Sequence, residues 1–376
     1  MNDFINILNA NPGTELIVRP RWFVLTDGTA DAVPSLLGES KPADPNRVKV
    51  FIDHETPCGS EAHAAKQKAL IRFAQNSGCQ LYNGYGISYQ LMLDRHVRAG
   101  DIVAHCGDFG SIYGSVGSYA LKLSQEEMAQ ALITGEVKFT IPETVHLRLT
   151  GSLNYPASAK DAALTALPLL GNTSGKLVMV GGMGLSLMSS SQRTAFFQLL
   201  SAGGCDAALA EDVSSSQAKT LDLETVVPVV SGPNDVMKIT PAEKLSAIDV
   251  SSVFIGGCSA GRIEDIRSAV NVINGRRVQR KVRTTVAFAS TEVYIKAANE
   301  GLIAKLMDAG VVVMNQGCSG CYAHSQALVD NKDIVLSAGS RECPDCTGAG
   351  TVPTLLCSAA TAMESAIAGY ICPARK

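Results

Sequence analysis

Three cysteines lie in two short segments of similar design, each an apolar run followed by a turn of small residues. Cys258 follows the run 252–256, and Cys318 and Cys321 follow the run 311–314 about sixty residues later. Such runs are typical of buried strands, so both turns are expected at strand ends. One plus two cysteines from separate strand ends can hold a metal cluster through three thiolates. The spacing therefore predicts a three-cysteine metal site.

Polar residues also follow two other apolar runs, 48–52 and 102–106. In open α/β sheets, ligands bind beyond the carboxyl ends of the strands, so these residues are expected near the cysteines. Helix capping, turn formation and a hydrogen-bonded core histidine are the alternative roles. These polar residues include Asp53, His54, Asp108 and Ser111.

The elements that would position these side chains alternate between strand and helix. Residues 1–45 are expected to be irregular, segments 137–141 and 145–149 to be paired strands, and 211–245 to contain a linker. Helices are predicted at 60–76, 124 onward, 158–169, 190–201, 263–273, 291–308 and 359–367, and further strands at 79–82, 176–180, 207–209, 284–288 and 333–336.

This order predicts the α/β class with three consecutive α/β/α domains. The expected domains are residues 1–157, 158–245 and 246–376, and the last carries the three cysteines.

Composition narrows the possible functions. The 376 residues have a net charge of −3 and no basic block, which disfavours nucleic acid or an anionic membrane as a partner. The N-terminus lacks a signal-peptide pattern, and no run of about 18 apolar residues could span a bilayer. We expect a soluble, cytoplasmic protein. Eleven cysteines in a reducing compartment are not a disulfide framework. The ones expected to be buried as small hydrophobic residues are Cys79, Cys205, Cys357 and Cys372.

The cysteine segments resemble those of the aconitase superfamily, in particular the large subunit of isopropylmalate dehydratase-type enzymes. Residues 255–265, IGGCSAGRIED, are similar to the family pattern I-G-S-C-T-N-S-R-I-E-D, and 317–321, GCSGC, to G-C-S-x-C. Other family landmarks occur in the same order along the chain. They are Asp53-His54 for D-H, residues 86–90 for G-I-x-H-Q, residues 107–111 for G-D-S-H-T, and Ser340-Arg341 for S-N-R-N.

The resemblance implies a [4Fe-4S] cluster held by Cys258, Cys318 and Cys321, with one open iron that binds the hydroxyl of a small hydroxy-carboxylate substrate. It implies a hydro-lyase that dehydrates or hydrates this substrate. The cluster would lie in the cleft between the domains. The candidate catalytic residues are then Asp53, His54, Asp108 and Ser111, with the first three nearest the leaving oxygen. Arginines would bind carboxylates in pairs of hydrogen bonds. The proton-abstracting serine belongs to a swivelling domain that this chain lacks, so a separate small subunit is the expected partner.

The chain also departs from the family pattern. Tyr89 and Gly110 stand at two family histidines, Ala260 and Ser340 at two asparagines, and Cys346 at a carboxylate-binding arginine. The residues expected to bind substrate are Arg341, Arg262, Ser340 and Tyr89. The three cysteines of the family pattern are retained better than its acid–base residues, so an altered substrate or an altered cluster is expected. His105 is a candidate replacement for a lost histidine, although its place in a strand is more typical of the core.

Extra cysteines suggest an alternative function. Cys343 and Cys346 form a C-x-x-C pair beside Arg341, and Cys58 and Cys106 lie beside predicted site residues. These four thiols could bind an additional metal or act in redox chemistry, or the pair could be a turn with incidental cysteines. The alternative is a cluster or metal scaffold, or a redox protein, that has lost hydro-lyase chemistry.

Overall fold

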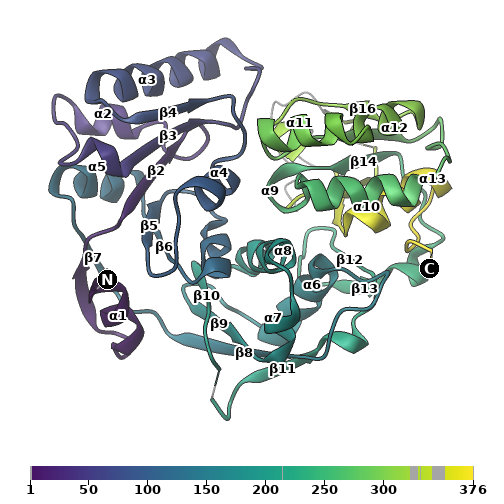
Figure 1. Ribbon diagram of the computed structural model, residues 1–376, viewed down its shortest axis with the longest axis horizontal. Coiled ribbons are helices and arrows are strands. Elements are labelled where there is room, and N and C mark those ends of the chain that lie inside the picture. Colours follow the sequence, from purple (N-terminus) through teal and green to yellow (C-terminus); the bar gives the residue numbers. More distant parts are fainter. Residues whose placement is uncertain (1, 214, 322–328, 331, 341–351, 376) are drawn as a thin grey trace.

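The computed structural model describes residues 2–213, 215–321, 329–330, 332–340 and 352–375. These residues form three α/β units, each built around its own sheet and its own hydrophobic core. In Figure 1 the first unit (purple to blue) and the third (green to yellow) stand beside each other above the second (teal). The predicted α/β class is confirmed.

The first unit contains a five-stranded parallel sheet in the order β4-β3-β2-β5-β6. The strands are β2 (Trp22–Thr26), β3 (Val48–Ile52), β4 (Gln80–Asn83), β5 (Ile102–His105) and β6 (Tyr119–Lys122). The helices are α2 (Val33–Leu37), α3 (Glu61–Ser77), α4 (Ser88–Arg95) and α5 (Gln125–Thr134), with 3-10 turns η1 (Pro45–Arg47) and η2 (Gly110–Val116). Outside this sheet lie α1 (Asn2–Asn9) and the antiparallel pair of β1 (Glu15–Val18) and β7 (Val137–Thr140).

The second unit contains a four-stranded parallel sheet in the order β10-β9-β8-β11. Its strands are β8 (Thr144–Thr150), β9 (Leu177–Gly181), β10 (Ala207–Ala210) and β11 (Lys219–Asp222). Its helices are α6 (Ala159–Leu170), α7 (Met183–Leu187) and α8 (Ser190–Leu200), with 3-10 turns η3 (Ser201–Gly203) and η4 (Leu223–Thr225).

The third unit contains a seven-stranded sheet in the order β13-β12-β18-β17-β14-β15-β16. Its strands are β12 (Val229–Ser231), β13 (Ile239–Pro241), β14 (Ser252–Ile255), β15 (Arg283–Val286), β16 (Val312–Val313), β17 (Val335–Ser337) and β18 (Thr354–Leu356). Its helices are α9 (Gly257–Ala260), α10 (Ile263–Ile273), α11 (Thr291–Asn299), α12 (Leu302–Asp308) and α13 (Ala359–Ala368), with 3-10 turns η5 (Ala242–Leu245) and η6 (Ser319–Cys321). Strands β14 to β18 are parallel, and β12 runs antiparallel to its neighbours.

Local signals explain the best-predicted helices. The Ser60 hydroxyl accepts a hydrogen bond from the His63 N–H at the start of α3, and Gly78 ends that helix with a φ of 72°. Helix α5 begins with the expected capping box between Ser124 and Glu127.

Three local predictions are wrong. Residues 1–45 are not irregular, because they contain α1, β1, α2 and the central strand β2. Segments β7 and β8 do not pair with each other: β7 pairs with β1, and β8 lies between β9 and β11. Both strands pair with strands from other parts of the chain, so Pro142 and its neighbours carry the chain from one sheet to the next. The linker expected at 211–245 contains β11, β12 and β13, which complete two sheets.

The sheets change between β7 and β8 and again between β11 and β12. The domain boundaries at residues 157 and 245 stay a prediction. Among the described residues, no helix combines the length and the apolar character that crossing a bilayer requires.

Candidate metal centre

The three predicted cysteines meet in one cavity. Cys258 lies in α9 after β14, while Cys318 and Cys321 follow β16, so parallel strands of one sheet deliver all three to the same edge. The cavity has a volume of about 200 Å³, and all three cysteines line it. Residues sixty or more positions apart in the chain are thus brought together, as the spacing predicts.

Two glycines leave space around Cys321. A Cβ atom at Gly257 would lie 3.3 Å from the Cys321 Sγ, and one at Gly339 would lie 3.2 Å from it. The turn that holds the cysteine pair is also fixed tightly: the Cys318 N–H donates to the Asp53 carbonyl at 3.0 Å. A side chain at Gly317 would approach that same carbonyl oxygen to 3.0 Å. The turn therefore needs small residues where it docks against the first unit.

The opposite wall of the cavity carries Asp53 and His54, which follow β3. The His54 Nδ1 lies 2.7 Å from the Asp53 Oδ1 and 3.2 Å from an oxygen of Asp27, which follows β2. Asp53 also caps α4, since its Oδ2 accepts the Ser88 N–H at 2.6 Å. One ligand atom each of Asp53, His54 and Cys318 lies within 4.8 Å of the other two. The cysteine wall and the carboxylate–imidazole wall therefore face one common space.

The charge of His54 follows from these contacts. Burial disfavours the charged imidazole, but the carboxylates of Asp53 and Asp27 outweigh it and raise the pKa of His54 to about 10. Burial raises the pKa of Asp27, yet hydrogen bonds and charge attraction from His54 bring it below its usual value. Gln67 donates to the second oxygen of Asp27 at 2.8 Å. At neutral pH this wall therefore presents a protonated imidazole held by two carboxylates.

The thiol of Cys258 has two polar neighbours. The Gln198 amide donates to its Sγ at 3.3 Å, and the Ser340 Oγ lies 3.0 Å from the same sulfur. Burial raises the pKa of Cys258 to about 12 and raises that of Cys318 as well. A coordinated metal would instead lower the pKa of these thiols, since a coordinating thiol is deprotonated outright.

Arg262 and Ser340, predicted to bind substrate, lie behind the cysteines. The Arg262 guanidinium donates to the Gln90 side chain, whose amide in turn donates to the Cys258 carbonyl at 2.7 Å. Arg262 does not line the cavity, and through Gln90 it supports the segment that carries Cys258. Ser340 contacts the Cys258 sulfur and also lines the neighbouring pocket.

Tyr89 and Asp108 line the cavity, whereas Ser111 does not. The Tyr89 hydroxyl accepts the Phe109 N–H at 3.2 Å, and burial raises the pKa of Tyr89 well above its usual value. Ser111 is fully buried: its hydroxyl donates to the Phe197 carbonyl at 2.6 Å and accepts from Ser201 at 2.5 Å. Ser111 therefore joins η2 to α8 in the interior, away from the cavity.

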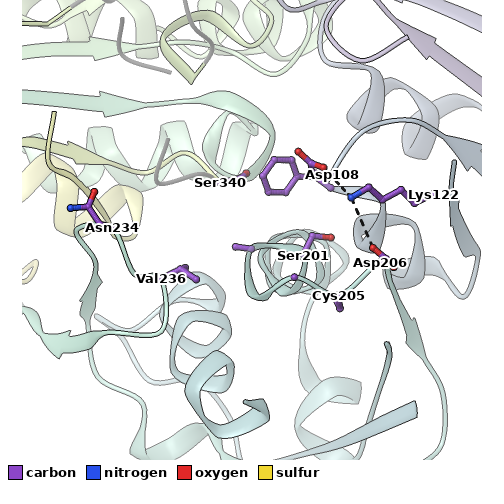
Figure 2. A pocket seen from close by; sticks show the side chains of 11 residues that line it. Asp108, Lys122, Ser201, Cys205, Asp206, Asn234, Val236 and Ser340 are labelled. Atoms are coloured by element: carbon purple, nitrogen blue, oxygen red, sulfur yellow. Dashed lines mark ion pairs between the residues drawn. The ribbon is translucent and has the colours of Figure 1, made fainter. Parts of the chain in front are cut away.

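A larger pocket of about 480 Å³ adjoins the cavity and shares Asp108 and Phe109 with it. Figure 2 shows the Lys122 ammonium between Asp108 and Asp206, with Asn234 and Val236 on the opposite side. The Lys122 Nζ lies 3.1 Å from the Asp108 carboxylate and 4.0 Å from that of Asp206. All three units contribute to this pocket.

The remaining predicted residues are not part of the cavity as described. Cys58 lies 3.3 Å from the Ser60 carbonyl oxygen, and Cys106 contacts the Ser124 carbonyl oxygen at 3.8 Å. Neither thiol lines the cavity or the larger pocket, and a metal or redox role for them stays a prediction. His105 is buried next to Gly110, where a Cβ would lie 1.9 Å from its Nε2, and it also lines neither space. The predicted residues that lie outside the described part of the chain are Arg341, Cys343 and Cys346.

Several residues of the site were not predicted. Asp27 directly follows β2, the strand that the sequence analysis missed, and a correct strand assignment would have exposed it. Gln198, Lys122 and Lys160 stand in no recognisable motif. Lys160 is buried, and its pKa falls to about 8 because burial disfavours its charge more than neighbouring acidic groups favour it.

The residues present fit a thiolate-held cluster. Three cysteines supply the donors, and Gly257 and Gly339 clear the space beside Cys321. A family model for the aconitase family (aconitate hydratase) matches residues 39–211 and 233–369. The chain belongs to the aconitase family.

Individual relatives agree with this membership. The chain is 28% identical over 400 residues to the 3-isopropylmalate dehydratase large subunit 2 of Archaeoglobus fulgidus, covering 98% of this chain and 96% of the relative. It is 27% identical over 358 residues to the homoaconitase large subunit of Thermus thermophilus, with coverages of 89% and 85%. The holo-form of aconitase X from Thermococcus kodakaraensis shares the fold, with a TM-score of 0.55, 12% identity and coverages of 87% and 84%.

Proposed function

We propose that this chain is an iron–sulfur hydro-lyase that removes water from, or adds water to, a small hydroxy-carboxylate. The observation that carries the proposal is the convergence of Cys258, Cys318 and Cys321 on a cavity whose other wall holds Asp53 and His54. Membership of the aconitase family and the dehydratase and homoaconitase relatives support it.

The three cysteines would hold a [4Fe-4S] cluster through their thiolates. When bound, such a cluster supplies an iron without a cysteine ligand, which acts as a Lewis acid toward a substrate hydroxyl. The protein's task is then to orient the substrate and to supply protons. Gly257 lines the space between the two walls, and Gly257 and Gly339 leave room beside Cys321.

His54 is the proton donor for the leaving oxygen. Its Nδ1 is held by Asp53 and Asp27, which fixes the ring and keeps the imidazole protonated. Tyr89 also remains protonated, so its hydroxyl can donate a hydrogen bond to an oxygen in the cavity. Asp108 lies at the opening between the cavity and the larger pocket and orients Lys122 there.

The substrate carbons beyond the reacting centre would occupy the larger pocket. Its lining combines polar and apolar residues, and Lys122 is the cation that the described residues place there for a carboxylate. The resemblance to the family implies that Arg341 also binds a substrate carboxylate.

A small subunit would complete the site. The relatives from Archaeoglobus fulgidus and Thermus thermophilus are both named as large subunits. The proton on the carbon next to the hydroxyl must go to a base, and in the resembled family that base comes from the swivelling domain. We therefore propose a partner chain that supplies this group.

The test is anaerobic reconstitution of the chain with iron and sulfide, alone and with a candidate small subunit from the same genome. A panel of hydroxy-dicarboxylates is then followed for appearance of the conjugated double bond. The proposal expects about four irons per chain and turnover of at least one compound. A chain with two irons, or metal that survives Cys258→Ser but not Cys343→Ser, would instead support the scaffold or redox alternative.

A further inference from the structure

Lys160 is a buried lysine whose ammonium bonds two loops of the cysteine site, one at Ser259 and one at residues 338–339. It lies in the first turn of α6, which belongs to the second unit, and its side chain reaches into the third unit. Its Nζ donates to the Gly339 carbonyl at 2.5 Å, to the Ala338 carbonyl, and to the Ser259 hydroxyl at 3.3 Å. Three protons and three acceptors match, so the ammonium is fully hydrogen-bonded.

Both loops are directly connected to Cys258. Ser259 follows that cysteine in α9, and residues 338–339 precede Ser340, whose Oγ lies 3.0 Å from the Cys258 sulfur. The Ser259 hydroxyl also donates to the Ala338 carbonyl at 3.0 Å. Gly339 in turn approaches Cys321 closely. The ammonium therefore lies behind the loops that set the positions of two thiols.

The charge of Lys160 has no carboxylate partner within ion-pair distance among the described residues. Asp161 is occupied by the N–H groups of Ser158 and Val229 at 2.8 and 3.0 Å. Asp265 accepts the Arg262 N–H at the start of α10. A buried, unpaired charge is costly, and it persists only where something compensates for it. The groups that favour the charged ammonium are first Cys357 and Asp265, and then Cys321. Lys160 also acts electrostatically on Cys258, so thiolates at positions 258 and 321 would add negative charge near the ammonium.

We propose that Lys160 is a positioning residue of the metal centre, which holds the Cys258 loop against residues 338–340 and balances the negative charge of the cysteine-held cluster. The inference rests on the proposed function, since it requires a cluster at this site. Removing a side chain that orients a metal ligand typically lowers the metal affinity about 10- to 100-fold. A nearby positive charge also favours the reduced, more negative state of a cluster, and so raises its reduction potential.

The test compares Lys160→Met with Lys49→Met in the anaerobically reconstituted protein. Lys49 is the matched control because it is also buried, and its Nζ donates to the Asn46 carbonyl at 2.8 Å in the first unit. We expect Lys160→Met to release iron to a chelator about 10- to 100-fold faster and to lower the reduction potential measured by redox titration with EPR detection. Lys49→Met should change neither quantity.

Two further variants keep the inference testable. Lys160→Arg retains the charge, so its potential should lie closer to that of the wild type than the potential of Lys160→Met does. If Lys160→Met does not fold, Ser259→Ala loosens the same connection and should still accelerate iron release severalfold. Wild-type release rates and potential in Lys160→Met, or a wild-type release rate in Ser259→Ala, would overturn the inference. A wild-type protein that takes up no cluster would instead overturn the proposed function.

Discussion

The two walls of the cavity are stabilised in different ways. The wall of Asp53 and His54 is held by neighbours in the first unit, chiefly Asp27 and the start of α4. The cysteine wall depends on contacts from other units: Gln90 from the first, and Gln198 and Lys160 from the second. The side chains of the proton-donating wall are therefore positioned by neighbours in their own unit, whereas the metal-binding wall draws side-chain contacts from all three units. Substitutions that separate proton transfer from metal binding test this division.

The largest expected effect is that of Cys318→Ser, which removes a ligand from the cysteine wall. Iron content and hydro-lyase activity should both fall to background, because two thiolates cannot hold the cluster as three do. Cys79→Ser is the control, since Cys79 is buried in the core of the first unit and lines neither the cavity nor the larger pocket. Iron analysis of both proteins decides the matter, and a wild-type iron content in Cys318→Ser would show that this thiol is not a ligand.

A smaller effect is expected for His54→Asn, which removes the proton donor from the opposite wall. We expect kcat to fall about 10²- to 10⁴-fold while iron content stays at the wild-type level. His96→Asn serves as the control, because His96 bonds Tyr82 elsewhere in the first unit. Loss of iron together with activity would mean that His54 contributes to metal binding, and the two walls would not be separate.

Asp27→Asn should act through His54. Removing one carboxylate lowers the pKa of His54 from its raised value of about 10, so the alkaline limb of the kcat/KM profile should move to lower pH. The proton donor works below its pKa, so activity at pH 9 should fall more than at pH 7, with a loss of roughly tenfold to 100-fold. Asp31→Asn, which only breaks a surface pair with Lys66, should leave the profile in place. An unshifted limb in Asp27→Asn would contradict the role of Asp27.

Lys122→Met tests the larger pocket. Loss of one charged hydrogen bond to a substrate carboxylate should raise KM about tenfold, with a smaller change in kcat. The control is Lys138→Met, whose lysine pairs with Glu15 on the surface. An unchanged KM in steady-state kinetics would place the substrate carboxylate elsewhere.

The smallest effect on activity is expected for Ser111→Ala, although the sequence suggested catalysis for this residue. Its hydroxyl is fully buried between Phe197 and Ser201, so the change should cost about 1 kcal/mol in the free energy of unfolding. Iron content and kcat should match the wild type. A loss of activity in a stably folded Ser111→Ala protein would return Ser111 to the list of catalytic residues.

Sequence patterns revealed the parts of the site whose residue types are unusual. Three cysteines in glycine-rich turns and an Asp-His pair after an apolar strand stand out from their surroundings, and both lie at the cavity. The capping signals at Ser60 and Ser124 likewise placed α3 and α5 correctly, because such caps act through neighbours in sequence.

The supporting residues could not be predicted in this way. Gln198 and Lys160 reach Cys258 and its neighbour Ser259 across 60 and 99 positions of the chain, and nothing in their local sequence distinguishes them. Gln90 stands in the landmark at 86–90, but that motif does not reveal its hydrogen bond to the Cys258 carbonyl 168 positions away. Asp27 was missed because β2 was not identified as a strand. Ser111 was misplaced because its motif fixes its position in the chain but not the direction of its side chain. Local patterns therefore identify ligands, whereas tertiary packing decides what holds them.

The most direct test of a cluster held by three cysteines is Mössbauer spectroscopy of the ⁵⁷Fe-reconstituted protein before and after brief mild oxidation. We expect about four irons per chain, of which one is lost on oxidation and returns with added ferrous iron, because that iron has no cysteine ligand. Four equivalent irons that all resist oxidation would contradict the open site, and with it the proposed hydro-lyase chemistry.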